Sequence, residues 1–181
     1  MFFTIPTIMT WTRIAAIPLI IGVFYLPIEP VTRNLIATIM FVVFAATDWL
    51  DGFLARRLNQ VSSFGAFLDP VADKILVCAS VLVLVHLGRA DVFVALIIIG
   101  REIAISALRE WMAELGQRTS VAVSSIGKLK TTFQMVAISV FLLNWQAIEP
   151  LAYGLLYAAV VLTLWSMIIY LKAAWPYLKQ P

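Results

Sequence analysis

Four aspartates stand close together in a part of the sequence that is otherwise apolar. Asp48 and Asp51 are three residues apart, and Asp69 and Asp73 are four residues apart. An ionised side chain at the centre of a membrane helix costs about 2.5–3.5 kcal/mol even on the more lenient insertion scale, so acidic residues in apolar helices mark functional sites. On a helix, spacings of three and four residues place both members of a pair on one face. The pattern therefore indicates a site built from carboxylates.

Carboxylates gathered at one site repel one another unless cations lie between them. Oxygen ligands without histidine or cysteine suit Mg²⁺, Mn²⁺ or Ca²⁺. Four carboxylates can hold two such ions, an arrangement suited to displacement at phosphorus. The alternative is a set of interfacial acids solvated by headgroup water, but the repeated spacing and the intervening Gly52 and Gly65 favour a metal site. The spacing therefore predicts that the four aspartates hold two divalent ions.

The amino-acid composition of the whole chain indicates a membrane protein. Of the 181 residues, 62% are hydrophobic and 13% are charged, whereas a soluble domain has about 25% charged residues and about half apolar ones. The excess apolar surface must face lipid. The net charge of +3 is small and dispersed, which argues against a nucleic-acid partner. Cys78 and His86, the only cysteine and the only histidine, are expected to be an apolar filler and a surface or interfacial side chain.

Six apolar stretches are long enough for membrane helices, which need ~20 residues, about twice the length of a barrel strand. The residues around Thr4–Thr7 predict a short interfacial segment before the first of them, and no cleavable signal peptide is evident. We therefore expect an all-α polytopic membrane protein, a six-helix bundle in which residues 1–181 form one domain. The expected spans lie at about residues 11–27, 33–57, 69–87, 92–115, 126–145 and 149–172.

The lysines and arginines indicate how these helices are oriented, because basic residues collect on the cytoplasmic side of membrane proteins. If the N-terminus is cytoplasmic, all of the 13 lysines and arginines except Arg33 and Arg89 fall on or near the inner side, although Arg101 lies well inside its span. We therefore expect both termini in the cytoplasm. The second helix then runs inward and the third outward, which brings the two aspartate pairs to one membrane depth.

Pro70 leaves two possibilities for the start of the third helix. Either Asp69 caps a helix that has Pro70 at its first position, or the helix begins near Ser62 and bends at Pro70. In both cases Asp69 and Asp73 point in neighbouring directions near the cytoplasmic end of the helix.

The aspartates belong to a longer pattern with a known counterpart. Residues 48–73 contain D-x-x-D-G-x-x-A-R-x8-G-x-x-x-D-x-x-x-D, which matches every fixed position in the signature of CDP-alcohol phosphotransferases, integral membrane enzymes of phospholipid synthesis. The similarity runs from residue 5 to about residue 170. Within the family the chain most resembles bacterial phosphatidylglycerophosphate synthases, in three stretches: Ile5-Pro6-Thr7 with Thr10 and Arg13, Arg101-Glu102-Ile103 through Arg109–Glu114, and Ser120–Ser124 followed by Gly127-Lys128-x-Lys130-Thr131.

The resemblance implies a role for each signature residue. Asp73 would act as the general base in addition to binding metal. The metal ligands would be Asp48, Asp51, Asp69 and Asp73. The binding site for the cytidine nucleotide and its diphosphate would be lined by Asp51, Gly52, Ala55, Arg56 and Gly65. The resemblance also implies six membrane helices, a site open to the cytoplasm and the lipid, and a homodimer. It leaves open whether Thr10 and Arg13 touch the nucleotide.

Basic residues outside the signature are candidates for binding the acceptor. Arginine and lysine both bind phosphate well, and Arg101 and Arg109 are spaced so that they can face one cavity. Positive-inside anchoring is the alternative, and for Lys128 or Lys130 alone it is the better one. A deep Arg101 needs a partner, yet the adjacent Glu102 points about 100° away around the helix. We expect Arg101, Arg109, Lys128 and Lys130 to bind the phosphate of glycerol 3-phosphate.

These expectations combine into one function. The protein would transfer the phosphatidyl group from CDP-diacylglycerol to sn-glycerol 3-phosphate, giving phosphatidylglycerophosphate and CMP. Its cofactors would be two divalent ions, Mg²⁺ or Mn²⁺. It would be a multi-pass homodimer in the bacterial cytoplasmic membrane, with its active site facing the cytoplasm.

Three other functions fit parts of the pattern. Cardiolipin, phosphatidylserine and phosphatidylinositol-type synthases share the signature and use other acceptors. A membrane prenyltransferase also binds a diphosphate with aspartates and Mg²⁺, although the Gly-x-x-Ala-Arg interval argues against it. A cation transporter would use the aspartates as its ion site, but it does not need a basic acceptor pocket.

Overall fold

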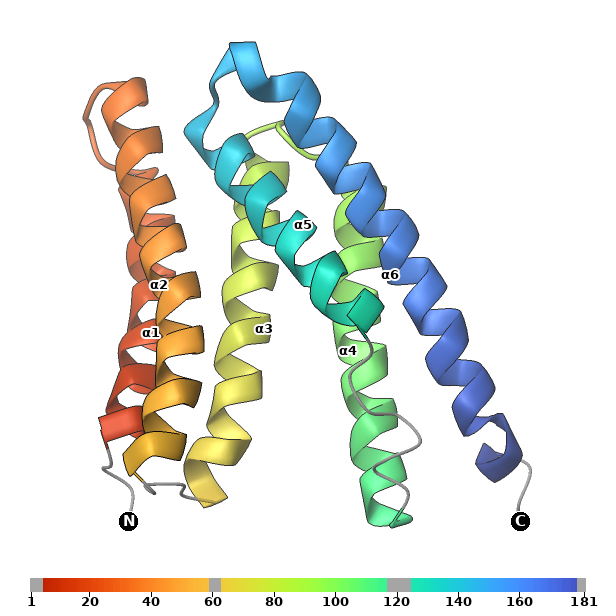
Figure 1. Ribbon diagram of the computed structural model, residues 1–181. Helices are drawn as coiled ribbons and strands as arrows, with labels where there is room; N and C mark the ends of the chain where they lie inside the picture. The colour runs from red at the N-terminus through yellow and green to blue at the C-terminus, as the bar shows by residue number, and fades with distance from the viewer. Residues whose placement is uncertain (1–4, 59–62, 117–124, 179–181) are drawn as a thin grey trace. The chain divides into compact units, whose positions relative to one another are not determined.

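The computed structural model describes residues 5–58, 63–116 and 125–178 (Figure 1). Within these ranges, the side chains of residues 5–7, 48–58, 63, 66, 125–128 and 178 lie outside the description. The described chain contains six α-helices, one short 3₁₀ helix and no strand, so the prediction of an all-α protein is confirmed. The elements are α1 (Ile5–Val23), α2 (Pro30–Leu58), α3 (Ser63–His86), α4 (Val92–Glu114), α5 (Ser125–Leu143), η2 (Gln146–Ile148) and α6 (Glu149–Leu178).

The helix starts differ from the predicted ones in two places. Helix α1 begins at Ile5, so the residues predicted to form a short interfacial segment are continuous with the first helix from Ile5 on, and their position at the membrane interface stays a prediction. Pro6 is compatible with a first helical turn, where its missing N–H needs no partner. Helix α3 begins at Ser63 and contains Pro70. The second possibility for Pro70 is therefore confirmed, and Asp69 lies inside the helix rather than at its cap.

Three helices end on residues with a left-handed backbone. Gly88 and Gly116 follow α3 and α4 with φ values of 69° and 74°, and Asn144 follows α5 with φ of 55°. Glycine adopts this conformation without steric cost, and asparagine tolerates it better than most residues. After α3 the amide of Arg89 donates to the carbonyl of Leu84 at 2.8 Å, which satisfies one of the last helical carbonyls. The residues at these three positions therefore explain why the helices end there.

The helices form two compact units, each described by itself. In the first unit, which holds α1, α2, α3, the end of α5 and η2, α1 packs against both α2 and α3. In the second unit, which holds α4, the first part of α5 and α6, α4 and α6 share a core. That core is formed by Ile105, Met112, Tyr170 and Ala174.

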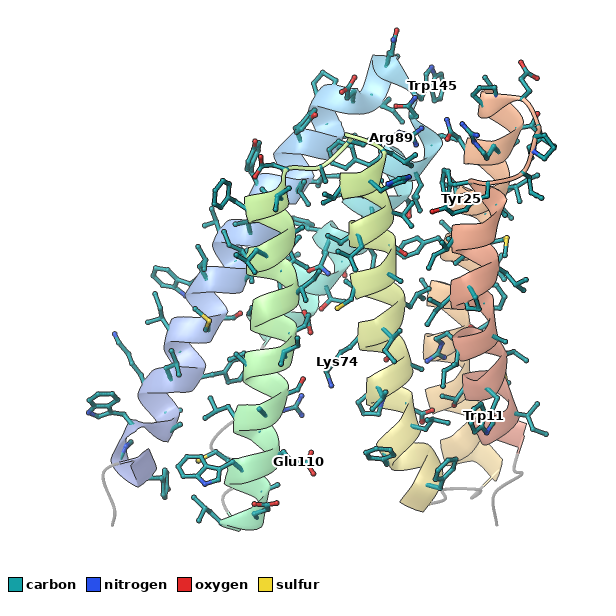
Figure 2. All side chains as sticks on the ribbon, turned by 180° about the vertical axis from the view of Figure 1, so that it is seen from behind. Trp11, Tyr25, Lys74, Arg89, Glu110 and Trp145 are labelled. Carbon is teal, nitrogen blue, oxygen red and sulfur yellow. The ribbon has the colours of Figure 1, made fainter. Side chains whose placement is uncertain are left out.

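Aromatic pairs join α1 to α3 near both ends of α1. Trp11 stacks on Phe64 with ring centroids 6.4 Å apart, and Tyr25, just beyond α1, stacks on the exposed His86 at 6.5 Å. Trp11 and Tyr25 mark the opposite ends of α1 in Figure 2. Offset aromatic pairs stabilise a contact beyond the area that they bury. The two pairs therefore hold α1 and α3 in a defined alignment.

Several helices carry apolar side chains on their outer faces. Two segments, Pro30–Thr47 and Gln146–Tyr177, are long and apolar enough to cross a membrane, and only 17% and 33% of them are buried within the protein. The core helix of a soluble protein would be mostly buried, so these faces fit lipid contact. Two shorter apolar segments are Ile8–Val23 and Leu129–Leu143. The number of six membrane spans stays a prediction.

Arg89 ties together three segments of the first unit. Its Nη1 donates to the carbonyls of Phe141 and Leu142 at 3.2 and 3.1 Å, near the end of α5, and its Nη2 donates to Oδ1 of Asn34 on α2 at 3.0 Å. Burial, together with the charge of nearby Arg33, lowers the pKa of Arg89 from its usual value. The guanidinium thus joins the loop after α3 to the ends of two other helices.

Arg89→Met is expected to lower the free energy of unfolding by about 1–3 kcal/mol, because it leaves the Asn34 side chain and two carbonyls without their donor. Thermal unfolding in detergent measures this effect. Lys172→Met, which removes an exposed lysine from α6, is the control and should unfold at the wild-type temperature. Equal unfolding temperatures for both variants would contradict the role given to Arg89.

Candidate active site

The signature residues lie on two consecutive helices of the first unit. The C-terminal part of α2 carries five of them, and the N-terminal half of α3 carries the other three. Those on α2 are Asp48, Asp51, Gly52, Ala55 and Arg56; those on α3 are Gly65, Asp69 and Asp73. The side chains on α2 lie outside the described ones. The predicted meeting of the two aspartate pairs therefore stays a prediction.

Both aspartates of α3 contact the same neighbouring helix. The Thr10 hydroxyl donates to Oδ1 of Asp69, and Nη1 of Arg13 donates to Oδ1 of Asp73 at 2.5 Å. The prediction that Asp69 and Asp73 point in neighbouring directions is confirmed, since both reach α1. The Asp73 side chain remains 36% exposed, so a substrate can reach it.

Thr10 and Arg13 are site residues that the signature does not contain. Both are fully buried, at 0% exposure. An arginine is almost never buried unless it is paired, and an ionisable residue inside an apolar helix marks a functional site. The position of an ionisable Arg13 in an apolar helix was therefore the signal in the sequence that could have identified it. The sequence places Arg13 on the inner side and leaves open whether it and Thr10 touch the nucleotide; it does not predict their contacts with Asp69 and Asp73.

The donor set on α3 fits a divalent cation. Asp69 and Asp73 offer carboxylate oxygens, the ligands that Mg²⁺ and Mn²⁺ prefer. Among the described residues, no three histidine, cysteine, aspartate or glutamate side chains gather in one place. Asp48 and Asp51 are needed to complete a two-ion site, and their side chains lie outside the described part of the chain.

A second polar cluster lies in the second unit, between α4, α5 and α6. Oε1 of Glu102 accepts from Nζ of Lys130 and from Nη1 of Arg101, the latter at 3.4 Å. Nη2 of Arg101 also donates to Oγ of Ser166 at 3.1 Å, and its guanidinium carbon lies 5.9 Å from the centre of the Tyr170 ring. The Lys130 and Arg101 side chains are 2% and 10% exposed. The structure thus brings together two of the four residues predicted to bind the acceptor.

Glu102 corrects the sequence analysis on one point. Its position on a helical wheel directs it away from Arg101, but both side chains are long enough to bend around the helix and meet. Glu102 lies between Arg101 and Lys130 and accepts a hydrogen bond from each. Lys130 is 28 residues from Glu102 in the sequence and lies on another helix, so only the packing of α5 on α4 reveals this partner.

The cluster holds more positive than negative charge. Arg101 and Lys130 face a single carboxylate, that of Glu102. Nε of Arg101 is buried, with no hydrogen-bond partner among the described residues. Buried polar atoms without partners are unusual and call for an explanation. A cationic, incompletely bonded cluster of this kind suits an anionic ligand.

The other two predicted acceptor residues are not part of these contacts. Arg109 is exposed on α4 and makes no hydrogen bond or ion pair with any described residue. The side chain of Lys128 lies outside the described ones. That Arg109 shares a cavity with Arg101 stays a prediction.

Comparison with known proteins agrees with the signature. A profile described as CDP-alcohol phosphatidyltransferase matches residues 3–165. Proteins of Shigella flexneri serotype 5b (strain 8401) and Escherichia coli (strain K12), both named CDP-diacylglycerol–glycerol-3-phosphate 3-phosphatidyltransferase, are 55% identical over 179 residues, covering 96% of this chain and of each relative. A protein of the same name from Salmonella choleraesuis (strain SC-B67) is 54% identical over the same share. Since the match spans nearly the whole chain, this protein belongs to the CDP-alcohol phosphatidyltransferase family.

Proposed function

We propose that this protein transfers the phosphatidyl group of CDP-diacylglycerol to sn-glycerol 3-phosphate, giving phosphatidylglycerophosphate and CMP. The observation that carries the proposal is the 55% identity, over 96% of the chain, to relatives that bear the name of this activity. The protein is therefore a transferase of phospholipid biosynthesis and acts at a membrane. The apolar outer faces of α2 and α6 agree with that setting.

The carboxylates of α2 and α3 supply the metal site in this proposal. Two divalent ions, Mg²⁺ or Mn²⁺, would be held by Asp48, Asp51, Asp69 and Asp73. When bound, such ions neutralise charge on a diphosphate and on the departing phosphate. The oxygen donors of Asp69 and Asp73 and their common direction support this assignment.

Asp73 is proposed as the general base. An alcohol is a weak nucleophile at neutral pH, so a carboxylate must take its proton as it attacks. The Asp73 side chain is partly exposed, whereas its ion-pair partner Arg13 is fully buried, so the carboxylate is the accessible member of the pair. The acceptor oxygen forms a bond to the phosphorus of the phosphatidyl group, its proton passes to Asp73, and the bond to the CMP oxygen breaks.

The remaining signature residues are proposed to hold the nucleotide. Small residues allow the CDP moiety to approach the backbone closely, and an arginine can bind the diphosphate as a bidentate donor. The proposed set is Asp51, Gly52, Ala55, Arg56 and Gly65. Their positions, on the two helices that also carry the aspartates, support a shared site.

Arg101 and Lys130 are proposed to bind the phosphate of glycerol 3-phosphate, with contributions from Arg109 and Lys128. The cluster around Glu102 has one positive charge in excess, and the buried Nε–H of Arg101 lacks an acceptor among the described residues. A phosphate group would complete both, because arginine matches its oxygens as a planar fork and lysine as a point charge.

We further propose that residues 1–181 form one membrane domain with six spans, both termini in the cytoplasm and the active site facing the cytoplasm. The protein would be a homodimer in the bacterial cytoplasmic membrane. In the first unit, Arg33 lies near the start of α2 and Arg89 lies just beyond the end of α3, where its side chain bonds to Asn34 of α2. The signature aspartates lie toward the other ends of α2 and α3. That separation agrees with the positive-inside assignment.

The proposed function is tested by acceptor choice. Purified protein is supplied with CDP-diacylglycerol and Mg²⁺, and CMP release is measured with glycerol 3-phosphate, serine, inositol or phosphatidylglycerol as acceptor. Glycerol 3-phosphate should give CMP and phosphatidylglycerophosphate. Turnover with only one of the other acceptors would reject the assignment. Release of pyrophosphate from an isoprenyl diphosphate would indicate a prenyltransferase, and ion flux without lipid conversion would indicate a transporter.

A further inference from the structure

Helix α1 gives each aspartate of α3 its own donor. Thr10 donates to Asp69, and Arg13, three residues later, donates to Asp73, four residues after Asp69. A spacing of three or four residues returns a helix to the same face, so both contacts lie along one line between the helices. The order of the donors along α1 matches the order of the carboxylates along α3.

The two donors on α1 are more deeply buried than the Asp73 carboxylate on α3. Thr10 and Arg13 are at 0% exposure, whereas the Asp73 side chain is 36% exposed. The donors are therefore enclosed by protein, and the partly open side of the pair is the carboxylate. A buried guanidinium is retained only where its pairing is specific. Arg13 is thus placed to hold Asp73 rather than to meet a ligand in solution.

Two aromatic stacks support the alignment of the helices, one before Asp69 and one after Asp73 along α3. Trp11 on α1 stacks on Phe64 near the start of α3, and Tyr25 stacks on His86 at the end of α3. These stacks restrict sliding and rotation of α1 against α3. The donors consequently meet the carboxylates in one register.

We propose that Thr10 and Arg13 are positioning residues: they orient the carboxylates of Asp69 and Asp73 toward the metal site. The inference rests on the proposed function only in taking these two aspartates as metal ligands. Groups that orient metal ligands by hydrogen bonding typically change metal affinity or activity 10–100-fold when they are removed. Neither residue is assigned a contact with substrate.

Thr10→Val tests the first contact, because valine keeps the shape of threonine and removes only the hydroxyl. Mn²⁺ binding to the purified full-length protein in lipid nanodiscs, followed by electron paramagnetic resonance of the free ion, should weaken about 10–100-fold. Thr10→Ser restores the hydroxyl and should restore Mn²⁺ affinity. Thr12→Val is the matched control: Thr12 is exposed on the same helix, and its hydroxyl donates to the carbonyl of Met9.

Arg13→Lys tests the second contact, since lysine keeps the charge but cannot reproduce the planar fork. Mn²⁺ affinity and kcat should both fall, while KM for CDP-diacylglycerol stays at the wild-type value. Arg33→Lys makes the same exchange near the start of α2, where Arg33 donates to the carbonyl of Phe24 far from the aspartates, and should change neither Mn²⁺ affinity nor kcat. A raised KM for CDP-diacylglycerol with wild-type Mn²⁺ affinity would place Arg13 on the nucleotide and overturn the inference.

Failure of this inference is distinct from failure of the proposed function. The Mn²⁺ measurement uses neither CDP-diacylglycerol nor an acceptor alcohol, so it is unaffected by which alcohol the enzyme accepts. Wild-type Mn²⁺ affinity in Thr10→Val and Arg13→Lys would refute the positioning role and leave the acceptor assignment standing. If only the acceptor assignment failed, the affinities would still fall in these two variants and not in the controls.

Discussion

Asp73→Asn is expected to lower kcat by about 10²–10⁴-fold, the usual contribution of a general base. Asparagine has nearly the same shape as aspartate and can still accept a hydrogen bond from Arg13, but it cannot take the proton of the attacking alcohol. Binding of CDP-diacylglycerol should be largely retained, because the proposed nucleotide residues are unchanged. Single-turnover CMP release and equilibrium binding of the nucleotide measure the two effects separately.

Asp69→Asn is the matched comparison, since Asp69 is the other aspartate of α3 and accepts from Thr10 rather than Arg13. A pure metal ligand loses activity because the ion binds less tightly, so raising the Mg²⁺ concentration should recover much of the turnover of Asp69→Asn. The same treatment should not recover Asp73→Asn. If excess Mg²⁺ restores both variants equally, Asp73 is a metal ligand and the base must be sought elsewhere. An Asp73→Asn variant with wild-type turnover would remove both roles.

Lys130→Met is expected to impair both stability and acceptor binding. Removing one partner of a buried ion pair leaves an uncompensated charge and typically costs about 3–5 kcal/mol. Here the remaining Glu102 keeps only its longer contact with Arg101. The loss of a charged donor to phosphate, about 1.5–3 kcal/mol, should also raise KM for glycerol 3-phosphate about 10–100-fold. Thermal unfolding and initial rates at varied glycerol 3-phosphate concentration report the two effects.

The double variant Lys130→Met with Glu102→Gln separates these effects. Removing the carboxylate charge together with the lysine should recover most of the lost unfolding temperature, since no unpaired charge is left. It should not recover KM for glycerol 3-phosphate. Lys172→Met, an exposed lysine on α6, controls for loss of a positive charge as such. A double variant with the wild-type KM would show that Lys130 serves only to neutralise Glu102.

Much of the helical framework follows from local sequence. Apolar stretches of sufficient length predict all six helices, because a helix in lipid must satisfy its backbone internally over the thickness of the bilayer. Gly88 and Gly116 follow the ends of α3 and α4, since glycine takes the left-handed backbone readily. Helix starts were less predictable. Hydropathy locates the apolar centre of a helix but not its polar first turns, so α3 begins at Ser63 rather than at Asp69.

The sequence alone determined the spacing of the signature aspartates, the family and the placement of Asp69 and Asp73 on one face of α3. These depend on helical periodicity, which is a property of neighbouring residues. Only the tertiary structure decided that Thr10 meets Asp69 across 59 residues of chain, that Arg13 meets Asp73 across 60, and that Lys130 meets Glu102 across 28. Periodicity gives the face of a helix, but its rotation and depth against a neighbour depend on packing along the whole interface. The partners of the site residues therefore cannot be read from any local pattern.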